Sequence, residues 1–159
     1  MSTMTVIWTR RARVACPYFM PKHRCEIGLW FHPARLPLGG GWHGSCTAPG
    51  HEQVQLTSDE LRDFCNLGYA AGCARLPEQR PWDAIRFSIA REGNSQVVMT
   101  YVCEINHHPG AHGTLEYDVS ARTWMNSHPD PRVQKMAECY LESYLLRKTT
   151  PASADEIAS

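Results

Sequence analysis

The cysteines of this chain are concentrated in its first half, where their thiols could bind a metal centre. Five of the seven lie within residues 1–73, in a stretch rich in Gly, Pro and His. Thiolates are strong ligands for zinc and for iron–sulfur clusters. We predict that four of them act together, and we call them the four-cysteine set: Cys16, Cys46, Cys65 and Cys73.

The sequence around each member favours a ligand role. Cys16 precedes Pro17, a step that keeps the residue out of helical geometry. Cys46 follows a glycine-rich run, and glycine lets backbone amides approach a sulfur. Cys65 and Cys73 are spaced C-x7-C around the expected end of a helix. Cys25, in the charged run Lys-His-Arg-Cys-Glu, is the reserve ligand.

The spacing of these cysteines bears on which metal they would hold. Structural zinc sites usually use close C-x2-4-C pairs, and none occurs here. A [4Fe–4S] cluster is larger and accepts thiolates from separated segments, a dispersed layout that broadly resembles the clusters of some nucleases and glycosylases, although none of their other motifs is present. We therefore predict a [4Fe–4S] cluster, with zinc and unligated cysteines as the alternatives. His43, near Cys46, could replace one ligand.

Two further groups of residues could form the active site of an enzyme. His107, His108 and His112 fall in one connection between expected strands, where a polar loop is the simpler interpretation. Cys25 could be a nucleophile with His23 as its base, but no oxyanion-hole signature accompanies the pair. Whether the protein is an enzyme stays open at this level.

Composition and charge limit the compartment and the kinds of partner that we expect for this protein. An odd number of cysteines, with no recognisable export signal, indicates a reducing cytoplasm rather than a disulfide scaffold. We expect no membrane span. The net charge is zero, yet residues 1–50 carry six Lys/Arg against one Glu. This basic segment could contact an acidic protein redox partner, and nucleic acid is disfavoured because no RNA- or DNA-binding motif is present.

Periodicity predicts an α+β fold, with a small antiparallel β-meander packed against a C-terminal helix. Alternating residues predict strands near 85–89, 97–105 and 114–119, with a hairpin turn at 92–95. Residues 9–50 are expected to be mostly loop, apart from one short strand at 25–31. A capping box at Thr57–Glu60 opens a helix that should end near Gly68 or Gly72.

The clearest helix spans 131–148, with an apolar stripe from Val133 to Leu145. Cys103 is expected in the core, and Cys139, off that stripe, is expected to be half-exposed. We predict one domain over 1–148, with a loop-rich metal-binding half at 9–75, a ββ(β)α half at 82–148 and a disordered tail at 149–159. The predicted function is a small cytoplasmic iron–sulfur protein with a redox, electron-transfer or structural cluster; the alternatives are a zinc-stabilised interaction module and a Cys/His enzyme.

Overall fold

The computed structural model describes residues 16–25, 28, 32, 35–67 and 73–149. The basic residues before position 16, most of the strand expected at 25–31, the expected helix end at 68–72 and the tail after 149 lie outside these ranges. The elements follow in the order β1 (Phe19–Arg24), β2 (Trp42–Cys46), α2 (Ser58–Glu60), η2 (Leu61–Cys65), β3 (Ala84–Glu92), β4 (Gln96–Ile105), β5 (His108–Asp118), β6 (Thr123–Trp124) and α3 (Pro131–Thr149).

The predicted meander is confirmed as an antiparallel four-stranded sheet in the order β3-β4-β5-β6. Its second hairpin is tighter than the sequence suggested, because β5 begins at His108 and not near 114. Asn106 and His107 both adopt positive φ, 51° and 65°, and so form the two-residue turn that joins β4 to β5. His108 and His112 therefore lie on a strand rather than in the loop that we expected.

A second, two-stranded sheet replaces the mostly irregular structure expected before residue 50. β1 pairs antiparallel with β2, and Phe19 lies opposite Cys46. Prolines and glycines concealed these strands from pattern analysis, since both residue types are uncommon in strand interiors. Gly44 is required here, because a Cβ at this position would lie 2.1 Å from the carbonyl oxygen of Met20. The two strands can approach so closely only with glycine there.

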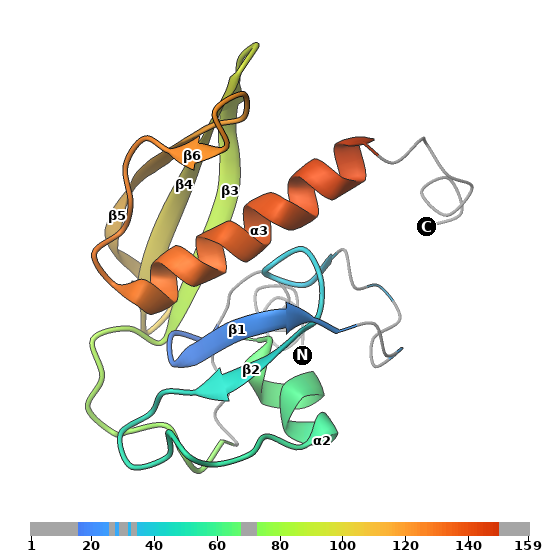
Figure 1. The fold of residues 1–159 in the computed structure, drawn as a ribbon. Helices are drawn as coiled ribbons and strands as arrows, with labels where there is room; N and C mark the ends of the chain where they lie inside the picture. Colours follow the sequence, from blue (N-terminus) through green and yellow to red (C-terminus); the bar gives the residue numbers. More distant parts are fainter. Residues whose placement is uncertain (1–15, 26–27, 29–31, 33–34, 68–72, 150–159) are drawn as a thin grey trace, which may run out of the picture.

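Helix α3 lies between the two sheets, with the meander on one side and the β1–β2 pair on the other (Figure 1). Val133, Met136 and Ala137 are buried, as the apolar stripe predicted. The helix also buries Cys139 and Ser143, and Ser143 Oγ donates a 3.0 Å hydrogen bond to the carbonyl oxygen of Leu38. The expectation that Cys139 is half-exposed was wrong because it assumed that only one face of the helix is covered.

The α+β class predicted from the sequence is thus confirmed, with the helix packed on the meander. Buried side chains from both sheets and α3 form one continuous core, which includes Phe19, Trp42, Ile85, Met99 and Met136. None of the helices in the described part of the chain combines the length and apolar character that a membrane crossing requires.

A short helical segment packs beneath β2. The predicted capping box is present, since the Thr57 side chain accepts from the Glu60 amide and the Glu60 carboxylate accepts from the Thr57 amide. The following residues, η2, form a π-helical turn that ends at Cys65. Asn66, only 1% exposed, then accepts a 3.0 Å hydrogen bond from Trp42 N and donates 3.1 and 3.0 Å bonds to the carbonyl oxygens of Trp42 and Leu61.

We expect Asn66→Ala to lower the free energy of unfolding by about 2–4 kcal/mol, because buried backbone groups of Trp42 and Leu61 would lose their partners. Asn126→Ala is the matched control. Its amide also bridges backbone groups, those of Glu116 and Thr114, but in an exposed position, so we expect a loss below about 1 kcal/mol. Urea unfolding measures both, and equal losses would contradict the bridging role of Asn66.

Candidate metal centre

All four members of the four-cysteine set line one small pocket. They come from four separate segments: the turn before β1, the end of β2, the end of η2 and the segment that begins at residue 73. Each is a free thiol and partly buried. The other lining residues are mainly apolar: Tyr18, Phe19, Ala48, Leu56, Phe64, Arg75 and Leu76. Four thiols in an apolar setting are a donor set suited to a thiophilic metal.

Strand pairing positions the first two cysteines. Because Phe19 lies opposite Cys46, the turn that precedes β1 brings Cys16 to the same end of the two-stranded sheet. The turn is closed by a 3.2 Å hydrogen bond from Phe19 N to the carbonyl oxygen of Cys16. The register of this sheet therefore determines where two of the four sulfurs lie.

Two polar contacts position the other two cysteines. Asn66 fixes the end of η2 against Trp42, so that Cys65 faces the pocket. Arg75 pairs with the Glu60 carboxylate, which returns the segment containing Cys73 to the start of the helical turn. Sequence patterns indicated the capping box that holds Glu60 but gave no sign of Arg75 as its partner.

Backbone amides point at two of the sulfurs. Ala48 N donates to Cys46 Sγ at 3.4 Å. The pKa of Cys16 is raised to about 11, chiefly by burial and to a smaller extent by the nearby thiols of Cys46 and Cys73, while hydrogen bonds from the Tyr18 and Phe19 amides oppose the rise. We expected amides near Cys46 from the glycines that precede it, but the donor is Ala48 N, which follows it. The Tyr18 and Phe19 amides were not predicted. Such N–H groups stabilise negative charge on a thiolate.

The thiols of the set lie close enough to raise one another's pKa. The pKa of Cys65 is raised, first by burial and then by Cys16, Cys73 and Cys46 in turn. Four neighbouring thiols in an apolar pocket strongly disfavour more than one negative charge. A bound cation would reverse this preference, because it would offset the charge of each thiolate.

The pocket does not have the geometry of a finished single-ion site. Its free space is about 20 Å³, roughly the volume that one water molecule requires. Tetrahedral zinc with Zn–S bonds of about 2.3 Å needs sulfurs roughly 3.8 Å apart. Among the described residues, no three His, Cys, Asp or Glu side chains are grouped closely enough to hold one ion. The sulfurs would therefore have to come closer together to hold a single zinc ion, and the pocket would have to enlarge to admit a cluster.

The other candidate residues lie elsewhere. Cys25 follows β1, its amide bonded to the carbonyl oxygen of Gly41 at 2.8 Å, and it is not among the pocket-lining residues. His43 lies opposite His23 across the β1–β2 pair and does not line the pocket either. His108 and His112 are exposed on β5. The structure thus brings together the four predicted cysteines and neither of their proposed substitutes.

The remaining two cysteines are core residues. Cys103 is 2% exposed, as predicted, and Cys139 is 3% exposed. Burial raises the pKa of Cys103 to about 11 and that of Cys139 to about 12. Both thiols are therefore held in the neutral form, and neither lies in the pocket of the four-cysteine set.

These shifts predict a loss of stability at alkaline pH. A thiol whose pKa is higher in the folded than in the unfolded chain stabilises the fold below the unfolded value, and this stabilisation is lost as pH rises toward the folded value. For Cys139 the window lies between about 9 and about 12. Between pH 8 and pH 10, ionisation of this thiol in the unfolded chain should lower the free energy of unfolding by about 1 kcal/mol. In urea unfolding, the free energy of unfolding of Cys139→Ala should fall over this pH range by about 1 kcal/mol less than that of the wild-type protein. An equal fall in the two proteins would contradict the raised pKa of Cys139.

No protein-family model, curated protein or solved structure matches this chain, so the interpretation of the site rests on its own residues and geometry.

Proposed function

We propose that the protein binds a [4Fe–4S] cluster through the four-cysteine set and acts as a small iron–sulfur protein. The observation that carries the proposal is the convergence of four thiols from four separate segments on one apolar pocket. Such clusters are usually held by four cysteine thiolates. Here the cluster would supply redox chemistry or structural support, while the chain's residues bind and shield it.

The amides around the sulfurs support a cluster. Hydrogen bonds to cluster sulfurs and solvent exposure are among the factors that set its reduction potential. Ala48 N donates to Cys46 Sγ, and the Tyr18 and Phe19 amides are directed at Cys16. These donors would stabilise the reduced, more negative state and so raise the potential.

The position of the pocket favours electron transfer over a purely structural role. All four residues of the set are partly exposed, so a bound cluster would lie close to the protein surface. Electron exchange with a partner protein requires such proximity. The reducing cytoplasm suits a chain whose seven cysteines are all free thiols. We therefore infer a protein redox partner in that compartment.

A zinc-stabilised interaction module is the second candidate. The observation that favours it is the small free space of the pocket, about 20 Å³, which would have to enlarge more for a cluster than for a single ion. The wide separation of the cysteines along the chain favours the cluster instead. Metal content separates the two, because a cluster brings iron with sulfide and the module brings one zinc per chain.

Elemental analysis of anaerobically purified protein should give about four irons and about four sulfides per chain, with broad visible absorption. Cys65→Ser should reduce the iron to below about a quarter of the wild-type content, because three thiolates and a weaker ligand would remain. Cys139→Ala, which removes a buried thiol outside the pocket, is the matched control and should keep the iron.

Three results would contradict the proposal. Colourless wild-type protein without iron would exclude the cluster, and one chelatable zinc per chain would favour the module. Full iron content in Cys65→Ser would show that the ligand set is wrong. Cys25→Ser should retain iron, since Cys25 does not line the pocket.

A further inference from the structure

Strand β3 forms one edge of the meander, and this edge is open in the part of the chain that the structure describes. β3 is the first strand of the four-stranded sheet and pairs there with β4 alone. Among the described residues, no backbone hydrogen bond joins residues 84–89 to a segment other than β4. A bulge between Ile89 and Arg91 then interrupts the strand. Because bulges protect sheet edges against further pairing, the available edge consists of residues 84–89.

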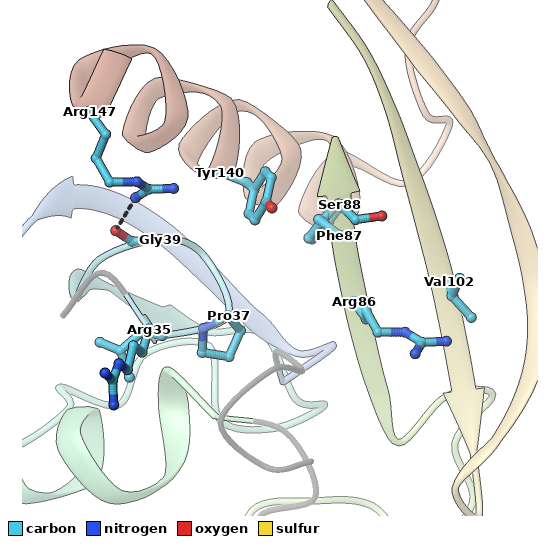
Figure 2. Close-up of a pocket in the computed structure, with 10 residues that line it drawn as sticks. Arg35, Pro37, Gly39, Arg86, Phe87, Ser88, Val102, Tyr140 and Arg147 are labelled. Carbon is cyan, nitrogen blue, oxygen red and sulfur yellow. Dashed lines mark hydrogen bonds between the residues drawn. The ribbon is translucent and has the colours of Figure 1, made fainter. Parts of the chain in front are cut away.

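A cavity of about 500 Å³ borders this edge. Three consecutive residues of β3, namely Arg86, Phe87 and Ser88, line it, so that both faces of the strand border the cavity. Segment 35–39 and α3 complete the lining, and Figure 2 shows Pro37 across the cavity from β3. In a sheet, neighbouring strands lie about 4.8 Å apart. The cavity therefore lies where one added strand would lie, whereas the further strands of a second copy's sheet would meet segment 35–39.

The two faces of β3 differ in chemistry along this edge. Arg86 and Ser88 are exposed on one face. Phe87 is buried on the other face, where its ring lies 5.9 Å from that of Tyr140 in α3. Side chains of a strand alternate between its two faces. A segment that pairs with β3 would thus place one row of side chains beside Arg86 and Ser88 and the other row beside the two aromatic rings.

The charged residues of the lining are all arginines. They are Arg35, Arg86 and Arg147, and no carboxylate is among the described lining residues. Arg147 Nη1 donates a 3.1 Å hydrogen bond to the carbonyl oxygen of Gly39, a neutral partner that leaves the guanidinium charge in place (Figure 2). Arg86 lies 3.4 Å from the Glu104 carboxylate, but its side chain is 45% exposed, and such exposed pairs are weak. These surroundings favour acidic residues in the row beside Arg86.

We propose that β3 accepts an extended acidic segment of a partner protein as an additional strand, in which acidic side chains alternate with apolar ones. Backbone hydrogen bonds to residues 84–89 supply the affinity, and the alternating side chains supply the specificity. The acidic row contacts Arg86 and Ser88, and the apolar row contacts Phe87 and Tyr140. This strand addition does not depend on the metal centre, because no member of the four-cysteine set lines the cavity.

Calorimetric titration of the full-length protein with blocked hexapeptides tests this inference. A peptide of alternating Glu and Val should bind with Kd below about 1 mM. The same peptide with every backbone nitrogen methylated keeps its side chains but cannot donate backbone hydrogen bonds, so it should bind at least about tenfold more weakly. A peptide of alternating Lys and Val, which reverses the charge, should also bind at least about tenfold more weakly.

Substitution and hydrogen exchange then locate the site. Arg86→Gln should raise the Kd of the Glu-Val peptide about tenfold, because a carboxylate would lose its guanidinium partner. Arg122→Gln is the matched control, since Arg122 is exposed and does not line the cavity, and it should leave Kd unchanged. In the wild-type protein, saturation with the peptide should slow exchange of amides within residues 84–89 and leave those of β6 unchanged.

Three results would overturn this inference: no binding of the Glu-Val peptide at millimolar concentration, equal binding of the methylated peptide, or unchanged exchange of the β3 amides on saturation. Self-association that protects the same amides without peptide would assign the edge to a second copy instead. Metal content measured in the same samples separates this test from that of the proposed function, because metal-free protein that still binds the peptide at β3 supports strand addition and contradicts only the cluster.

Discussion

The buried side chain of Asn66 binds both backbone groups of Trp42, and the arrangement of the N-terminal half depends on this contact. It joins the helical turn that ends at Cys65 to the strand that ends at Cys46. The pairing of Phe19 with Cys46 adds the turn that contains Cys16. Three of the four sulfurs are thus positioned by two sets of hydrogen bonds, and the Arg75–Glu60 ion pair adds the segment of Cys73. Little regular structure is needed to build this pocket.

The two halves of the chain are stabilised in different ways. The meander and α3 contribute most of the apolar core from regular elements. The segments around the four-cysteine set contribute a two-stranded sheet and a short helical turn, an arrangement that is marginal by itself. α3 supports them through Ser143 and Leu38, and in our proposal a metal centre supplies the remaining stability by linking four segments.

Sequence patterns predicted the C-terminal half well, because its strands alternate and its helix carries an apolar stripe. They failed where the physical signal is not periodic. β1 and β2 contain proline and glycine, the Asn106-His107 turn lacks the usual glycine, and Cys139 is buried because α3 is covered on two sides. The grouping of Cys16, Cys46, Cys65 and Cys73 was predicted from local context alone. The amides and the Arg75–Glu60 pair that organise them depend on contacts between distant residues, which no local pattern records.

X-ray absorption at the metal edge of anaerobically purified protein tests the central claim most directly, because it reports the ligands and the neighbouring metals together. The account predicts iron with a first shell of sulfur alone and a second shell of further iron. A zinc edge with one shell of four sulfurs would contradict the cluster but would agree with the four cysteines as ligands. A first shell of nitrogen or oxygen, or no bound metal, would contradict the four-cysteine centre itself.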